Sequence, residues 1–210
     1  SPDAIFVNRG DRVVFTNHAM LRLVGTSDPQ QVADAMTPAT RALLVETPTN
    51  PLMRCTDLAA MGEIAAKHEA LLIVDNTFAT PVNQQPLAVG FDMVVQSATK
   101  SLNGHSDVTA GVVTASHAAL APIEQVRRLT GGVLDPRASA ALGRGLKTLT
   151  LRVAQQNATA LAVAQALQDD PRVVRVWYPG LPDHPDHALA SRQMSGFGGM
   201  VCLDLGDDLS

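Results

Sequence analysis

Cysteine is scarce in this sequence, because the 210 residues include only Cys55 and Cys202. The two lie far apart and lack the CxxC spacing of zinc and redox motifs. They therefore cannot form a disulfide framework, and they argue against a zinc site. Few cysteines without a disulfide framework are typical of proteins in a reducing compartment, so we expect the protein in the cytoplasm.

Long hydrophobic runs and a strong charge of either sign are also absent. No apolar run approaches the roughly 18 residues that a membrane-spanning helix needs, so we expect no membrane partner. The formal net charge is -4, which gives no reason to expect nucleic acid as a partner. Hydrophobic residues make up 46% of the chain, enough for the core of one domain or of two small ones.

The two ends of the chain carry few signals. Residues 1–4 have neither the basic segment nor the long apolar segment of a signal peptide. Residue 1 is a serine and the chain stops just after a predicted strand. We therefore expect a fragment or a processed form.

Short apolar runs alternate with helical patterns through the middle of the chain. Four runs read as buried strands, at residues 42–45, 71–74, 93–95 and 110–114, and a helix is predicted from Thr56 or Asp57 to about His68. Strands that are apolar on both faces are typical of parallel sheets covered by helices. The pattern predicts an α/β fold with a mostly parallel sheet and right-handed crossovers, over residues 28–150.

The pattern changes beyond that sheet. Residues 136–167 are rich in Ala and Leu and predict one long helix or two joined ones. A strand at 173–178, a loop rich in Pro and His at 179–187, a helix at 188–194 and a strand at 200–205 follow. This order predicts the start of a small α+β domain over residues 151–210.

Lys100 is the most informative residue, because it comes shortly after a predicted buried strand. Asp75 directly follows another such strand, and in open α/β sheets ligands bind beyond the carboxyl ends of the strands. Pyridoxal phosphate (PLP) needs an amine for its Schiff base and an acid beside its pyridine nitrogen, which Lys100 and Asp75 could supply. The hydroxyls of Ser97 and Thr99 could bind its phosphate. A lysine in such a sequence is more often a solvated surface residue, and an Asp at a strand end often caps the next turn.

Other polar residues allow two interpretations each. Glu46 and Asn50 follow a third strand and could serve either the site or a turn. For His105 and Asp107 we favour local loop hydrogen bonds over a catalytic pair, since residues two apart do not face one another on a helix. The group at 184–187, with two His and one Asp, lies among prolines and favours an exposed loop over a metal site.

Several long motifs resemble the Cys/Met-metabolism (trans-sulfuration) family of PLP-dependent enzymes, which includes cystathionine γ-synthase and the cystathionine and methionine γ-lyases. The resemblance runs from about Ser27 to the C-terminus. The motifs that carry it are VETPTNP (45–51), VDNTF (74–78), SATKSLNGHSD (97–107), RGLKTL (144–149), YPGL (178–181) and GFGGM (196–200).

The resemblance implies a type I aminotransferase-like fold and PLP as the cofactor. Lys100 would form the Schiff base, Asp75 would pair with the pyridine nitrogen, and Ser97 and Thr99 would hold the phosphate. Asn50 would lie beside the ring oxygen of the cofactor, with Glu46 adjacent. The substrate would be a small amino acid, and homodimers or homotetramers are expected for the family.

The sequence also departs from the family. It is about half the family's length and lacks the N-terminal part, with its glycine-methionine phosphate turn and stacking tyrosine, and the C-terminal arginine for the substrate carboxylate. Ser101 replaces a tyrosine that often follows the lysine. Residues 1–26 are expected to lie outside the family, and resemble the start of a PAS sensory domain. A hairpin at the edge of the sheet is the alternative.

Two functions remain open from the sequence. The first is a trans-sulfuration enzyme, or a fragment of one, that performs γ-replacement or β- or γ-elimination on sulfur amino acids or acylhomoserines. The second is an inactive truncated or chimeric protein that keeps a PLP half-site and acts as a binding or sensory module. The residues that would face the substrate are largely those the sequence lacks, so it does not choose among the reactions.

Overall fold

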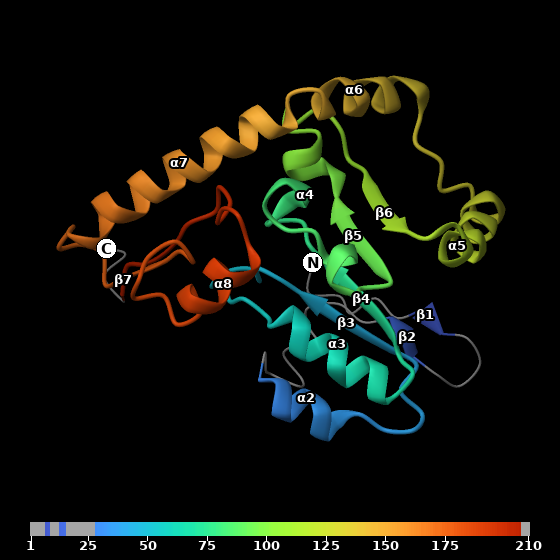
Figure 1. Ribbon diagram of the computed structural model, residues 1–210. Helices are drawn as coiled ribbons and strands as arrows, with labels where there is room; N and C mark the ends of the chain where they lie inside the picture. Colours follow the sequence, from blue (N-terminus) through green and yellow to red (C-terminus); the bar gives the residue numbers. More distant parts are fainter. Residues whose placement is uncertain (1–6, 9–12, 16–27, 207–210) are drawn as a thin grey trace.

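The computed structural model describes residues 7–8, 13–15 and 28–206, and its centre is a four-stranded sheet with the order β3-β4-β5-β6 (Figure 1). The strands are β3 (Ala42–Glu46), β4 (Leu71–Asp75), β5 (Met93–Ser97) and β6 (Gly111–Ala115). β3, β4 and β5 are parallel, and β6 runs antiparallel to β5. The prediction of a mostly parallel sheet is therefore confirmed.

One face of the sheet is covered by α2 (Pro29–Ala35) and α3 (Leu58–Lys67), which lie side by side below it in Figure 1. Asp57 is the N-cap of α3, since its side chain accepts a hydrogen bond from the amide of Ala60 at 3.1 Å. Met61 and Val74, both fully buried, belong to the core cluster between these helices and the strands. The burial of this apolar face is what holds α2 and α3 on the sheet.

Short helical turns lie between the strands. These are α4 (Thr80–Asn83), η1 (Pro86–Val89) and η2 (Ala98–Leu102). Ala98 and Leu102 of η2 are buried in a cluster with Leu149 and Val153 of a later helix. This packing fixes the turn that contains Lys100 against a segment some fifty residues further along the chain.

Residues 136–167 form two helices, α6 (Pro136–Leu146) and α7 (Leu149–Gln168), separated at Lys147 and Thr148. A small antiparallel pair, β7 (Arg175–Trp177) and β8 (Cys202–Asp204), and the helix α8 (His187–Gln193) follow. Tyr178 and Leu181 pack with Ala160 and Ala164 of α7. α7 thus contacts both the sheet side and the C-terminal pair, and the domain boundary near residue 150 stays a prediction.

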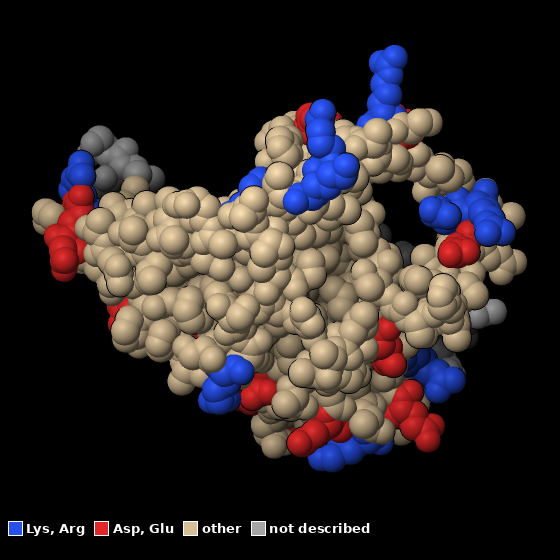
Figure 2. Space-filling view, turned by 45° about the horizontal axis from the view of Figure 1, so that its top comes forward, with Lys and Arg blue, Asp and Glu red and all other residues tan. Residues whose placement is uncertain are grey.

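The helix α5 (His117–Thr130) has no buried residue, although Val126 and Leu129 are apolar. It lies beyond β6 in Figure 1, and Figure 2 shows an opening between it and the body of the molecule. Val126 and Leu129 are exposed, at 59% and 80%.

The N-terminal strands β1 (Val7–Asn8) and β2 (Val13–Phe15) pair with one another as a separate two-stranded sheet. The expectation that such a hairpin forms an edge of the main sheet is therefore wrong. The PAS-like interpretation of residues 1–26 also predicts an Arg-Gly-Asp turn at 9–11 and the start of a helix at 19–24, and both lie outside the described residues. No helix in the described ranges is both long enough and apolar enough to span a membrane.

Candidate functional site

The carboxyl ends of β3, β4 and β5 bring three of the predicted residues to one edge of the sheet. Glu46 is paired with Asp75 in the register of β3 and β4, and Asp75 with Val95 on β5. Ser97, two residues beyond Val95, ends β5. This is the edge at which ligands bind in open α/β sheets.

Asp75 is half-buried and held through only one of its carboxylate oxygens. Its Oδ1 accepts hydrogen bonds from the backbone amide of Thr77 at 3.0 Å and from the Thr77 hydroxyl at 2.6 Å. The same hydroxyl oxygen accepts the amide proton of Ser97 at 2.8 Å. Asp75 Oδ2 has no hydrogen bond within the described residues. The two bonds from Thr77 therefore orient the carboxylate, and Oδ2 can still accept a hydrogen bond.

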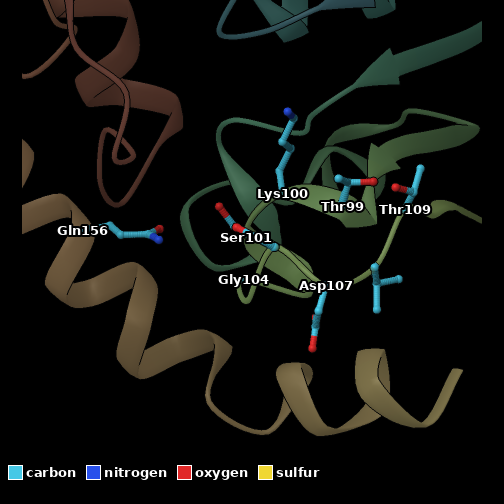
Figure 3. Close-up of a pocket in the computed structure, with 9 residues that line it drawn as sticks. Thr99, Lys100, Ser101, Gly104, Asp107, Thr109 and Gln156 are labelled. Carbon is cyan, nitrogen blue, oxygen red and sulfur yellow. The ribbon is translucent and has the colours of Figure 1, made fainter. Parts of the chain in front are cut away.

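Lys100 lies in η2, one turn beyond the end of β5. Its carbonyl accepts the amide proton of Gly104 at 2.8 Å, and Asn103 donates its amide proton to the Ala98 carbonyl at 2.9 Å. The Lys100 side chain is exposed, and in Figure 3 it extends away from Asp107. Across the described ranges no side chain forms an ion pair with its amine, which is therefore accessible.

The two predicted phosphate ligands differ in their present contacts. The Ser97 hydroxyl has no hydrogen-bond partner in the part of the chain that the structure describes. The Thr99 hydroxyl accepts the Ala110 amide proton at 3.0 Å and donates to the Ala110 carbonyl at 3.4 Å. Thr99 would have to give up the longer of these bonds in order to donate to a phosphate.

Asn50 and Glu46 occupy different places. Asn50 is exposed in the turn after β3, where the Met53 amide donates to the Thr49 carbonyl at 2.9 Å. Glu46 is half-buried at the strand end. The structure therefore puts Glu46 beside Asp75, and shows no contact that joins Asn50 to Asp75 or Lys100.

A cavity of about 610 Å³ opens beside the Lys100 turn (Figure 3). Thr99 and Lys100 line it, whereas the other four predicted residues do not. Hydroxyl side chains are the most frequent kind in its wall. The remaining lining residues are Ser101, Gly104, Ser106, Asp107, Val108, Thr109 and Gln156.

The loop that follows Lys100 is held by local hydrogen bonds, as predicted for His105 and Asp107. His105 Nδ1 lies 2.7 Å from the Asn103 carbonyl oxygen, and Asp107 accepts from Asn103 Nδ2 at 2.8 Å. That hydrogen bond lowers the pKa of Asp107, with a smaller contribution from Arg144. The two side chains each serve the loop and do not bond to one another.

The prediction of an exposed loop at 184–187 is wrong for His184, which is only 4% exposed. Asp186 accepts two hydrogen bonds from the Arg54 guanidinium, at 2.6 and 3.0 Å, and one from the Cys55 amide at 2.8 Å. His184 is buried because the loop packs against the segment before α3 at this point, whereas Pro185 is exposed. Among the described residues, no group of three His, Cys, Asp or Glu side chains could hold a metal ion.

Two residues of the site region are not found from the sequence. Thr77 could have been recognised, because an Asp side chain commonly accepts a hydrogen bond from the backbone amide two positions further on. Arg152 has no local signal. It lies on α7 and reaches the carbonyl of Ser101 at 2.7 Å, across fifty-one positions of the chain.

The comparisons with known proteins address the family directly. Residues 10–210 match the family model described as Cys/Met metabolism PLP-dependent enzyme. The chain belongs to this family. It is 50% identical over 186 residues to the cystathionine gamma-lyase of Bacillus subtilis (strain 168), covering 88% of this chain and 49% of that protein. It is 44% identical over 199 residues to the cystathionine beta-lyase of Lactococcus lactis subsp. cremoris (strain MG1363), covering 94% and 52%.

The fold is similar to solved structures of the same kind. The crystal structure of cystathionine gamma-lyase from Lactobacillus plantarum, complexed with L-serine, matches with a TM-score of 0.83 and 43% identity. That match covers 86% of this chain and 48% of the other. The predicted type I aminotransferase-like fold is thus confirmed, and the chain spans about half the length of the relatives it matches.

The comparisons also correct one expectation. The sequence predicts that residues 1–26 lie outside the family, and this is wrong for residues 10–26, because the family model begins at residue 10. None of the comparisons supports the resemblance to a PAS domain.

Proposed function

We propose that this chain forms part of a PLP-dependent trans-sulfuration enzyme. The reaction would be γ-replacement, or β- or γ-elimination, on sulfur amino acids or acylhomoserines. The observation that carries the proposal is that an exposed amine, on Lys100 just after β5, and an oriented carboxylate, on Asp75 at the end of β4, follow neighbouring parallel strands. The relatives include both gamma- and beta-lyases, so they support the class rather than one reaction.

The residues at the sheet edge fit the chemistry of PLP. Asp75 keeps one carboxylate oxygen for the protonated pyridine nitrogen, while Thr77 holds the other at 2.6 Å. Ser97 offers an unused hydroxyl for the phosphate, and Thr99 a second one after exchange of its bond to Ala110. Asn50 would lie beside the ring oxygen, with Glu46 adjacent to the site. When bound, the cofactor would supply an electron sink for negative charge at the substrate α-carbon.

Each of the proposed site residues would have its own role in the reaction. Lys100 Nζ would hold the cofactor covalently, and as a free amine it would accept and return protons at the substrate carbons. Asp75 would keep the pyridine nitrogen protonated through an ion pair in a partly buried setting. Ser97 and Thr99 would fix the phosphate end and so the direction in which the cofactor faces Lys100.

We also propose the wider setting of the enzyme. Residues 28–150 would form the cofactor-binding part, and residues 151–210 the start of a smaller domain. The working protein would be a cytoplasmic homodimer or homotetramer, as expected from the family resemblance. The exposed apolar residues Val126 and Leu129 of α5 are consistent with a surface that other polypeptide covers.

The experiment uses the small number of lysines in the chain, which are Lys67, Lys100 and Lys147. PLP is added to the wild type, to Lys100→Ala and to the double variant Lys67→Ala with Lys147→Ala. The near-visible absorbance is recorded, and borohydride-reduced samples are mapped by mass spectrometry. We expect attachment at Lys100 in the wild type and the double variant, and none in Lys100→Ala.

Equal attachment at all three lysines, or no attachment in the wild type at saturating PLP, would contradict the proposal. Turnover of cystathionine or of an acylhomoserine then separates the two candidate functions. A chain that attaches PLP through Lys100 without turnover would be the inactive binding module.

A further inference from the structure

Arg152 makes an unusual set of contacts for a charged side chain near a protein surface. It is half-buried on the first turn of α7, and no carboxylate pairs with it anywhere in the described ranges. Instead, Nη1 donates to the Ser101 carbonyl at 2.7 Å, and Nη2 donates to the Gly145 carbonyl at 2.8 Å. Nη2 also lies 3.4 Å from the Leu102 carbonyl oxygen, and Nε donates to the Thr148 hydroxyl at 3.0 Å.

These acceptors lie at the ends of two helical segments. Ser101 and Leu102 end η2, the turn that contains Lys100, and Gly145 lies in the last turn of α6. Carbonyls at helix ends lack partners within the helix and carry partial negative charge. The guanidinium therefore caps both ends at once, and its planar fork suits two acceptors better than a single ammonium group does.

Two glycines leave room for this arrangement. A Cβ on Gly104 would overlap the Arg152 guanidinium, and a Cβ on Gly145 would overlap the backbone carbonyl of Asn103. Gly104 also has φ +73°, which favours glycine. The backbone after Lys100 is thus pressed between α6 and the Arg152 side chain, with no space for larger residues.

We propose that Arg152 is a positioning residue for Lys100. By holding the carbonyls of Ser101 and Leu102, it fixes the turn from which the Lys100 side chain leaves the backbone, and so directs the amine toward the sheet edge that carries Asp75. This inference rests on the proposed function, because the role of the fixed turn is to present Lys100 for attachment of PLP. Arg152 itself does not touch the cofactor in this assignment.

The test compares Arg152→Gln and Arg152→Lys with the matched control Arg172→Gln. Arg172 is an exposed arginine whose contacts are with Asp170, so its replacement removes the same charge away from the turn. The first measurement is the rate of PLP attachment at Lys100, followed by absorbance. The second is hydrogen exchange of the Asn103 and Gly104 amides without PLP, since both amides are bonded within the turn.

We expect Arg152→Gln to slow attachment on the order of tenfold, because charge-assisted hydrogen bonds are strong ones. We expect exchange at Gly104 to rise by a similar factor, with Arg172→Gln unchanged in both measurements. Arg152→Lys should fall between the wild type and Arg152→Gln, because one ammonium group cannot reproduce the fork. Gly104→Ala should also slow attachment, and should do so less in an Arg152→Ala background, where the overlap is removed.

The outcomes separate the two proposals. If the wild type does not attach PLP, the proposed function fails, and the exchange measurement still decides the role of Arg152. If Arg152→Gln attaches PLP and exchanges the Asn103 and Gly104 amides at the same rates as the wild type, the inference is overturned. If Arg152→Gln does not fold, Arg152→Lys decides instead, and a wild-type rate in that variant would overturn it.

Discussion

The Thr77 hydroxyl donates to one carboxylate oxygen of Asp75 at 2.6 Å, and the same oxygen atom of Thr77 accepts the Ser97 amide proton at 2.8 Å. One side chain therefore links the ends of β4 and β5. It sets the direction of the Asp75 carboxylate and the position of Ser97, the two residues proposed for opposite ends of the cofactor.

Replacement of Thr77 by Val should weaken PLP binding while the sheet is kept. Val preserves the volume but leaves Asp75 with only the backbone bond, and leaves the Ser97 amide without its acceptor. We expect the dissociation constant for PLP to rise about tenfold, or about 1.4 kcal/mol, which is near the lower end of the roughly 1.5–3 kcal/mol contributed by a hydrogen bond to a charged group. Absorbance titration measures it. Thr77→Ser keeps the hydroxyl and should bind nearly as the wild type; equal affinity of Thr77→Val would show that Thr77 does not orient Asp75.

The sequence predicts the strands and their carboxyl ends because these depend on local apolar runs. The runs at 71–74 and 93–95 correspond to β4 and β5, and the prediction places Asp75 correctly at the end of β4. The helix α5 was not predicted, although Ser116 caps it and Gly131 ends it with φ 73°. The apolar residues of α5 also recur on one face of the helix, so its two end signals and its hydrophobic pattern could have predicted it.

The contacts of the site could be predicted only in part. Those of Asp75 are local, since Thr77 is two positions away. Those of Arg152 depend on the path of α6 and α7, which return the chain to the Lys100 turn, and no short motif contains that path. Likewise, His184 lies among prolines and reads as exposed, yet it is buried because the loop packs against residues 52–55.

The glycine-rich segment at 196–199 packs against a reciprocal amide pair between Asn83 on α4 and Asn157 on α7. Each amide nitrogen donates to the other's oxygen, at 3.0 and 2.9 Å, and the Gly198 amide donates to Asn157 Oδ1 at 2.8 Å. A Cβ on Gly196 would overlap both Asn side chains. The pair therefore joins α4, α7 and the segment before β8.

Asn157→Ala should destabilise the protein by about 2–3 kcal/mol, because Asn83, only 4% exposed, would lose its partner in a buried place. Urea unfolding measures the change. Gln155→Ala is the matched control, since that exposed amide bonds to Thr159 on the same helix and, among the described residues, to no other segment. A loss of equal size in the two variants would argue against a specific role for the amide pair.

Burial raises the pKa of the Cys55 thiol to about 12 from an ordinary value of 9.0. The folded protein thus keeps this proton while the unfolded chain loses it, so stability should fall as the pH rises from 9.0 toward about 12. The difference corresponds to about 4 kcal/mol. In Cys55→Ala this alkaline loss should be smaller, as measured by urea unfolding at several pH values.

The matched control for Cys55 is Cys202→Ala, since Cys202 is only half-buried. Tyr178, whose pKa burial raises to about 12, should produce a remaining alkaline loss in all variants. If Cys55→Ala loses as much stability at alkaline pH as the wild type, the thiol does not limit stability at high pH.

His184 should make the protein sensitive to mild acid. Its Nδ1 accepts the Asp186 amide proton at 3.2 Å and its Nε2 lies 3.3 Å from the Leu52 carbonyl oxygen, so the network assigns the neutral form with the proton on Nε2. Burial lowers the pKa of His184 below its ordinary 6.5. As the pH falls through 6.5, the unfolded chain takes up a proton first, and the stability that the neutral ring contributes is then lost as the pH passes the lower folded pKa.

His184→Asn removes this titration, and the Asn Oδ1, in the place of Nδ1, can still accept from the Asp186 amide. We expect the wild type to lose stability on acidification from pH 6.5 and the variant to lose less, measured as urea midpoints at a series of pH values. His117→Asn, which changes an exposed histidine at the start of α5, is the matched control and should follow the wild type.

Asp186 does not account for this loss of stability in mild acid. Burial raises its pKa, but the hydrogen bonds from Arg54 and the Cys55 amide outweigh that effect and lower the pKa below 3.8. The contribution of Asp186 to stability is therefore lost only in stronger acid. If His184→Asn loses as much stability on acidification as the wild type, groups other than His184 cause that loss.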